Sequence, residues 1–411
     1  MKSKILKFLV IFFLLFDVNF KQLPGFTTSR VIFSGLMLHF LLNKSGPKFS
    51  LSLNKNLVRF SLILGIIFII AILQYVFSSD ITQMGRLTYF TMYGIITPFI
   101  LIKYFKSRKE FVLIVGFASL TQAILTLCSY FIPIFKDFFN DLILYNSNFG
   151  EENLMRARGF VSVAGATFSV IQFCGVASFL IYLRYYSKSN ITTLLIWCAL
   201  IVIIISILFI GRTGLFLSLV ALLLYIISNK ISIKKAIIWA IVFFSFFQLN
   251  FLTLLEKFTT NIDGYNTELF VAWIDSGFRI NNDLVEGLSE MPIPKLSYST
   301  IIGTGLVKGP NGEGNASGHD TGYIQSYYSM GLIFAIIFYL SYYLLLISLV
   351  KKSRDFVGFI LVLVLVLIES KEFFIFSYTY PFFLLSFILI GQNFNKITNI
   401  NKFNNNSPII N

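Results

Sequence analysis

Residues 191–227 read ITTLLIWCALIVIIISILFI, then GRTG, then LFLSLVALLLYII, and this stretch decides the fold. The first apolar run, 191–210, contains no charged residue. It has the length that an α-helix needs to cross a hydrocarbon core of about 30 Å. The turn at 211–214 carries a single charge, Arg212, and a second apolar run follows at once. The stretch therefore predicts two membrane-spanning helices joined by a minimal turn.

The same pattern repeats in both directions along the chain. Of the 411 residues, 56% are hydrophobic and only 13% are charged, which is more apolar surface than a water-soluble fold of this size buries. Continuous apolar runs indicate helices, because the strands of a membrane barrel would alternate with a period of two. We predict an all-α, polytopic membrane helix bundle of about 12 transmembrane helices with a large periplasmic loop. The predicted spans are 1–16, 31–42, 57–77, 87–102, 111–131, 160–183, 191–210, 215–227, 236–255, 323–350, 356–368 and 373–390.

Short lysine-rich loops at 103–109, 230–235 and 351–354 predict the orientation, because cytoplasmic loops of membrane proteins are enriched in Lys and Arg. They place both termini in the cytoplasm of a bacterium, with the chain in its inner membrane. Transmembrane helices 1–9 then occupy 1–255, and the large periplasmic loop occupies 256–322. Helices 10–12 occupy 323–391. A disordered cytoplasmic tail is expected over 392–411, which is rich in asparagine.

Several functional classes are disfavoured by composition. The net charge of +14 is scattered between the spans, whereas a nucleic-acid surface would gather it on one face. The three cysteines lie inside apolar runs, so neither a disulfide framework nor a zinc site is expected. No phosphate-binding glycine loop or metalloprotease motif occurs, and no metal or other cofactor is predicted. The spans carry amides such as Gln74, Gln122 and Gln172 but no Asp, Glu or Lys at mid-depth, which argues against ion-coupled transport.

Arginines on the predicted outer side are the sharpest chemical signal, since positive charge is usually depleted there. A guanidinium presents a planar fork of donors that fits phosphate oxygens. An outer pyrophosphate site is therefore reasonable, and Arg212 is the best candidate because its turn is otherwise minimal. The alternative is that these side chains reach lipid headgroups or pair with Glu151 and Glu152. The candidates are Arg156, Arg158, Arg212 and Arg279.

His319 and Asp320 end a glycine-rich stretch, 303–318, directly before the predicted tenth span. An imidazole or carboxylate in this position could accept a proton from a hydroxyl nucleophile, so both are candidate catalytic residues, with His319 preferred. The alternative is a structural turn in which Asp320 caps a helix that begins near Tyr323.

Taken in order, these elements resemble the Wzy-type O-antigen polymerases and, more distantly, the O-antigen ligases of surface polysaccharide assembly. The resemblance is carried by Arg156 or Arg158 with Gly159, by Gly-Arg-Thr-Gly at 211–214, by Gly-Thr-Gly at 303–305 and by His-Asp-Thr-Gly-Tyr at 319–323.

The resemblance implies a metal-independent membrane glycosyltransferase that acts at the periplasmic face. Its substrates would be undecaprenyl-pyrophosphate-linked oligosaccharides, and a chain-length regulator would be a further partner. Trp273, Tyr323 and Tyr327 become candidates to stack on sugars, with interfacial anchoring as the alternative. An O-antigen ligase and a flippase or transporter of lipid-linked oligosaccharides remain alternatives.

Overall fold

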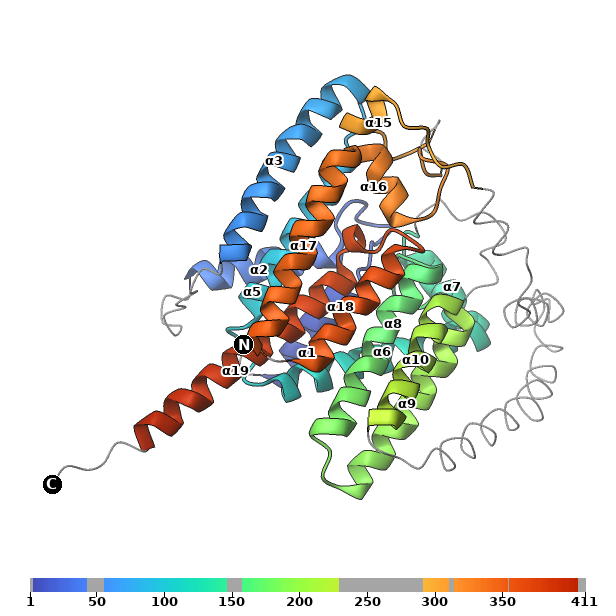
Figure 1. Cartoon of the computed structure of the whole chain (residues 1–411). Helices are drawn as coiled ribbons and strands as arrows, with labels where there is room; N and C mark the ends of the chain where they lie inside the picture. Colours follow the sequence, from blue (N-terminus) through green and yellow to red (C-terminus); the bar gives the residue numbers. More distant parts are fainter. Residues whose placement is uncertain are drawn as a thin grey trace.

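The computed structural model describes residues 3–42, 55–145, 157–228, 291–309, 314–353 and 355–405. The regular secondary structure of this part of the chain is helical, and only isolated β-bridges occur in the segments between the helices (Figure 1). The predicted all-helical fold class is therefore confirmed for it. The predicted ninth span, 236–255, and most of the predicted large loop lie outside the described residues.

The first half of the chain contains α1 (Lys4–Leu15), α2 (Thr28–Leu42), α3 (Lys55–Ser78), α6 (Arg108–Phe131), α7 (Pro133–Leu142), α8 (Gly165–Tyr185), α9 (Asn190–Ile210) and α10 (Arg212–Ser228). Between α3 and α6, α4 (Thr82–Tyr89) continues through a π-helical segment, η1 (Phe90–Ile96), into α5 (Thr97–Leu101). The later part contains α15 (Tyr298–Ile302), α16 (Gly322–Met330), α17 (Leu332–Ser353), α18 (Phe356–Glu369), a 3₁₀ turn η5 (Ile375–Ser377) and α19 (Thr379–Asn405).

Within the described residues, five helices are long and apolar enough to cross a membrane, namely α3, α6, α8, α9 and α17. Four shorter apolar segments, α2, α10, α18 and Thr379–Gln392, overlap the predicted spans 31–42, 215–227, 356–368 and 373–390. These helices support a membrane protein, and five of the predicted spans have a full-length helix among the described residues. α19 continues past residue 390, where the sequence predicted a disordered tail, and its end projects from the bundle (Figure 1).

α8 lies at the centre of one half of the bundle and packs against α6, α9 and α10 (Figure 1). It approaches α6 closely because, at two positions along the pair, a glycine of one helix faces a larger side chain of the other. A Cβ atom at Gly116 would lie 2.3 Å from the ring of Phe179, and one at Gly175 would lie 2.2 Å from the Cβ of Ser119. Small residues at such contacts let membrane helices pack backbone to backbone. α3, in contrast, lies at the periphery beside α17, with much of its apolar surface exposed (Figure 1).

The predicted tenth span, 323–350, was wrong as a single helix, because the chain breaks at Gly331 between α16 and α17. Gly331 has φ +92°, and a Cβ there would lie 2.3 Å from the carbonyl carbon of Ile302. Gly303, with φ +101°, lies on the other side of the same contact. The Gln74 amide, from α3, donates to the carbonyls of Ile302 at 2.9 Å and Met330 at 3.3 Å. The glycine-rich stretch is thus closely packed at this end of α3.

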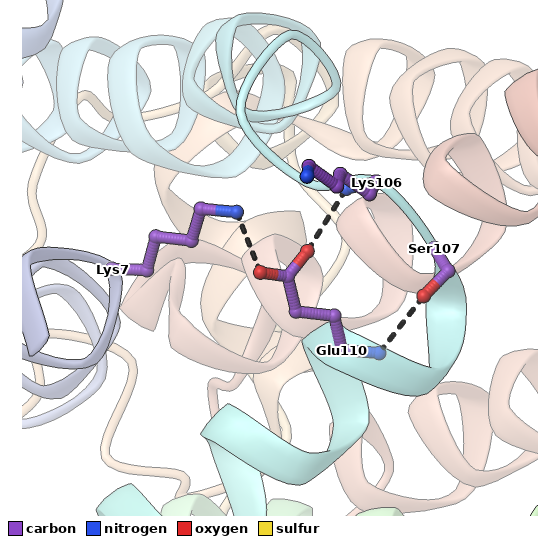
Figure 2. A network of polar contacts seen from close by, with 4 residues as sticks. All are labelled: Lys7, Lys106, Ser107 and Glu110. Carbon is purple, nitrogen blue, oxygen red and sulfur yellow. Dashed lines mark hydrogen bonds and ion pairs between the residues drawn. The ribbon is translucent and has the colours of Figure 1, made fainter. Parts of the chain in front are cut away.

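Two ion pairs join helix ends that the sequence places on the cytoplasmic side, and we call this the lysine-rich end. Figure 2 shows the first, in which Lys7 Nζ donates to Glu110 Oε1 at 2.6 Å. Glu110 also accepts from the Lys106 N–H at 3.0 Å, and its own N–H donates to Ser107 Oγ, which caps α6 (Figure 2). Arg108 forms the second pair with Asp355 at 2.6 Å. Buried or half-buried pairs of this kind fix which helix ends are neighbours.

At the opposite end of the bundle, Asp80 binds the segment that follows α15. Its Oδ2 atom accepts from the N–H groups of Val307 at 2.8 Å and Lys308 at 3.2 Å, and its Oδ1 atom accepts from Thr82 at 2.9 Å. Burial acts to raise the pKa of Asp80, but these hydrogen bonds outweigh it, and the pKa is lowered. We call this end, which carries residues 17–27, 78–82, 211–213, 303–331 and 369–378, the loop end.

We predict that the loop end faces away from the cytoplasm. In intact cells, a cysteine in place of Tyr298, which is 81% exposed, should react with a membrane-impermeant thiol reagent. A cysteine in place of Lys352, at the lysine-rich end, should react only after the membrane is breached. The unsubstituted chain measures the background from its three native cysteines. The opposite labelling pattern would invert the orientation.

Candidate functional site

Gly211–Gly214 joins α9 to α10, and its glycines are required by packing against α8. A Cβ at Gly214 would lie 2.2 Å from the carbonyl oxygen of Ser169, and the Gly214 N–H donates to Ser169 Oγ at 3.0 Å. Arg212 and Thr213 are therefore held at the first turn of α10, with Arg212 half-buried and Thr213 buried. The structure thus gives the glycines a packing role and places the arginine at the loop end.

Lys371 brings a second cation to the same place. It lies in the turn that follows α18, and its Nζ atom donates to Thr213 Oγ1 at 2.7 Å across 158 residues of sequence. The contact sets a lysine next to Arg212, although nothing in the spacing of the two segments predicts that they meet. The charged run Glu-Ser-Lys-Glu at 369–372, between two apolar spans, was the only sequence signal for this turn.

Glu369, at the end of α18, is completely buried. Its carboxylate accepts three hydrogen bonds, from the hydroxyl of Tyr339 at 2.7 Å and from the N–H groups of Phe374 at 2.8 Å and Ile375 at 2.7 Å. A carboxylate can be buried when donors satisfy its oxygens in this way. The bonds fold the chain after α18 back on itself and thereby position Lys371. The sequence predicts Glu369 in the short connection between the spans 356–368 and 373–390 and gives no sign of its burial.

Arg86 approaches this turn from α4. Its guanidinium lies 4.0 Å from the centre of the Phe373 ring and is attracted electrostatically by Asp80 and Glu369. Cations prefer the face of an aromatic ring because of its quadrupole. We define the turn cluster as Arg86, Arg212, Thr213, Glu369 and Lys371. It combines one residue predicted from sequence with four that were not.

The His-Asp motif lies beside the turn cluster. A Cβ at Gly322 would be 2.4 Å from Glu369 Oε1, so α16 begins directly against that carboxylate. Asp320 is two residues earlier in the chain and its side chain is exposed. Its Oδ1 atom accepts from Asn315 Nδ2 at 3.4 Å. Asp320 does not cap α16, since Thr321 is the N-cap residue and no side chain bonds there, so the expected capping role is wrong.

His319 is buried, with 6% of its surface exposed. Its Nδ1 atom accepts a hydrogen bond from the Thr321 N–H at 3.1 Å. A neutral imidazole has one donor and one acceptor nitrogen, so Nε2 carries the hydrogen in this arrangement. The ring can therefore donate through Nε2, and it can act as a base there only after its tautomer changes.

Arg158 lies on a segment next to the end of α9. The N–H of Ala157 donates to the Phe209 carbonyl at 3.1 Å, three residues before Arg212. The Arg158 guanidinium, however, lies 4.5 Å from the ring centre of Tyr145. Burial raises the pKa of Tyr145 to about 12, an effect that the nearby arginine opposes. Arg158 and Arg212, the two predicted arginines that the structure describes, thus lie on neighbouring segments. Arg158, however, stacks on Tyr145, outside the turn cluster.

The two described tyrosines proposed for sugar binding use their hydroxyl groups inside the protein. Tyr323 shares a hydrogen bond with Tyr343 at 2.8 Å and donates to the Val366 carbonyl at 3.1 Å. The Tyr327 hydroxyl lies within hydrogen-bond distance of the Pro294 carbonyl, at 3.2 Å, and of Thr300 Oγ1, at 3.1 Å. These bonds favour a role in holding α16 in place. Arg156, Arg279 and Trp273 lie outside the described residues and stay predictions.

The described residues thus form an all-helical membrane-protein fold, with several helices able to cross a membrane and a cluster of cationic side chains at one end. In the part of the chain that the structure covers, no group of three or more His, Cys, Asp or Glu side chains could hold a metal ion. No family model, curated protein or solved structure matches this chain.

Proposed function

We propose that this chain is a membrane glycosyltransferase that polymerises a surface polysaccharide. It would transfer the glycan of one undecaprenyl-pyrophosphate-linked oligosaccharide to a hydroxyl of a second lipid-linked repeat unit, at the periplasmic face of the inner membrane. The observation that supports this proposal is the turn cluster, in which Arg86, Arg212 and Lys371 gather at the loop end around a single turn. Such a group of cations suits a pyrophosphate at the level of lipid headgroups.

In this reaction a glycosidic bond forms between the anomeric carbon of the donor and the acceptor oxygen. The bond from that carbon to the pyrophosphate oxygen breaks, and lipid pyrophosphate departs with the electron pair. Cationic side chains aimed at the departing oxygens stabilise the charge as it develops. The proton of the acceptor hydroxyl must pass to a base.

We assign the base to the His-Asp motif, because it lies beside the turn cluster. Asp320 is exposed and can accept a proton through its carboxylate directly, whereas His319 uses Nδ1 to hold the Thr321 N–H. The geometry therefore favours Asp320, in contrast to the preference for His319 that the sequence suggested. Donor and acceptor must also be aligned, and a base fixed next to the cationic residues contributes to that alignment.

A pair of asparagine variants separates the two candidates. Asp320→Asn should lower polymer synthesis about 10²- to 10⁴-fold, the usual contribution of a general base. His319→Asn should retain most activity, since an asparagine oxygen can still accept from the N–H two residues later and preserve the turn. The measurement is polymer formed per amount of membrane protein. Loss of polymer only in the histidine variant would return the role of base to His319.

The function itself is tested by deleting the gene and separating the surface polysaccharides by electrophoresis. A polymerase predicts that the ladder disappears while a single repeat unit is retained. Loss of all capping would identify a ligase. Accumulation of lipid-linked units on the cytoplasmic side would identify a flippase, and an unchanged ladder would contradict all three.

A further inference from the structure

Arg86 has more hydrogen-bonding capacity than the protein uses. A guanidinium has five N–H donors. In the described part of the chain, Arg86 makes no hydrogen bond and no ion pair within 4 Å, and its contact is the face of Phe373. The residue is only partly buried, and its guanidinium lies at the loop end against Phe373.

The carboxylates that attract Arg86 are already satisfied by neutral donors. Asp80 accepts from three backbone N–H groups, and Glu369 accepts from two N–H groups and the Tyr339 hydroxyl. Both carboxylates thus orient the guanidinium by electrostatic attraction without occupying its donors.

Gln83 is a second, independent sign that something binds here. It precedes Arg86 by three residues on α4, so the two side chains lie on one face of the helix. Only 1% of Gln83 is exposed, yet neither its amide nitrogen nor its amide oxygen has a hydrogen-bond partner among the described residues. Buried amides without partners are rare in folded proteins, and a ligand or an ordered water normally satisfies them.

Lys371 supplies a further charge on the same turn, two residues before Phe373, and is tied to the start of α10 by its bond to Thr213. Cations therefore reach the turn from two sides, Arg86 from α4 and Lys371 from the side of Arg212. An anion with oxygens on two adjacent phosphorus atoms can be contacted from both sides at once, whereas a single phosphate presents fewer oxygens to share.

We propose that Arg86, together with Gln83 and Lys371, binds the diphosphate group of a lipid-linked substrate. The identity of the lipid rests on the function proposed above, whereas binding of a diphosphate does not. Arg86 is the anchor, because its planar fork can donate two parallel hydrogen bonds to phosphate oxygens. Gln83 contributes an amide N–H from the same face of α4.

Titration of the purified full-length chain in detergent with inorganic pyrophosphate tests the site. We expect Arg86→Gln to raise the Kd about tenfold to a hundredfold, the usual effect of losing hydrogen bonds to a charged group. Arg86→Lys should weaken binding at least severalfold, because a point charge cannot form the bidentate contact. Lys308→Gln is the matched control, since this lysine is exposed at the same end and contacts Asp80 through its backbone.

Gln83→Leu separates binding from stability. An apolar side chain of similar size in place of an unsatisfied buried amide should leave the Tm unchanged or raise it. We expect the same variant to bind pyrophosphate several times more weakly than the native chain does. A structural role alone would alter the Tm and leave the Kd unaffected.

Two results would overturn the proposal. One is a Kd for pyrophosphate that is the same in Arg86→Gln as in the native chain, or that rises as much in Lys308→Gln as in Arg86→Gln. The other is equal competition by orthophosphate or by phosphatidylglycerol micelles, which would identify a general headgroup site. If pyrophosphate binds as expected while gene deletion leaves the polysaccharide ladder unchanged, the site stands and the polymerase function falls. If gene deletion removes the polysaccharide ladder but pyrophosphate binding does not depend on Arg86, the polymerase function stands and the proposed site falls.

Discussion

Replacement of Glu369 by alanine is expected to destabilise the protein by about 3–5 kcal/mol, enough to remove most folded chain from the membrane. The N–H groups of Phe374 and Ile375 would remain buried without their acceptor, whereas the Tyr339 hydroxyl could still donate to the Gly322 carbonyl at 3.3 Å. Each buried donor left unsatisfied costs about 1–3 kcal/mol. The measurement is the thermal unfolding of the purified chain, followed by tryptophan and tyrosine fluorescence.

A double-mutant cycle with Glu369→Gln and Tyr339→Phe tests whether these two side chains account for the effect. Glutamine keeps the size of the side chain and one acceptor oxygen, so it should cost less than alanine. Because both residues belong to one hydrogen-bond network, their effects should not add. Strict additivity would show that the 2.7 Å contact between them contributes nothing to stability.

Gly331→Ala is expected to destabilise the junction of α16 and α17 by several kcal/mol. Gly331 has φ +92° and ψ 151°, a region that is nearly restricted to glycine, and occupying it with another residue costs about 1–3 kcal/mol. The new Cβ would also meet the carbonyl carbon of Ile302 at 2.3 Å, which requires the backbone to shift and adds roughly 1–3 kcal/mol more.

Gly65→Ala in α3 is the matched control. Nothing lies within 4 Å of a Cβ at this position. Alanine should therefore stabilise α3 by up to about 1 kcal/mol through its higher helix propensity. If the Gly331→Ala chain has the same Tm as the native chain, the close contact between the segments at Gly303 and Gly331 is not required for stability.

Gly331 is also the position at which the prediction of a single helix over 323–350 was wrong. The apolar residues on both sides of it, 323–350, form one continuous pattern, and glycine inside a membrane helix is common. The break arises because the backbone at Gly303 packs against it, with Gln74 donating to the carbonyls on both sides. That partner segment comes from elsewhere in the chain, so no local pattern reveals it.

For His319 and Asp320, the sequence predicted the location but not which residue could act as a base. Their position before an apolar run correctly predicted a motif at the start of a helix, and α16 begins at Gly322. Which of the two could act as a base depended on hydrogen bonds made by the folded turn. The bond from the Thr321 N–H to Nδ1 gives the His319 imidazole the role of acceptor within the turn, which the residue type alone does not reveal.

The helical character of the described residues, and the suitability of several helices for a membrane, follow from the amino-acid sequence alone, because the length and continuity of apolar runs specify both. The sequence also identified Arg212 as a cation in a minimal turn. The packing of the helices, in contrast, brings the turn after α18 to this position through the bond from Lys371 to Thr213, and it places Arg86 on Phe373 of the same turn. The physical reason is that apolar periodicity records which face of a helix is buried, whereas contacts between distant segments depend on how the helices pack.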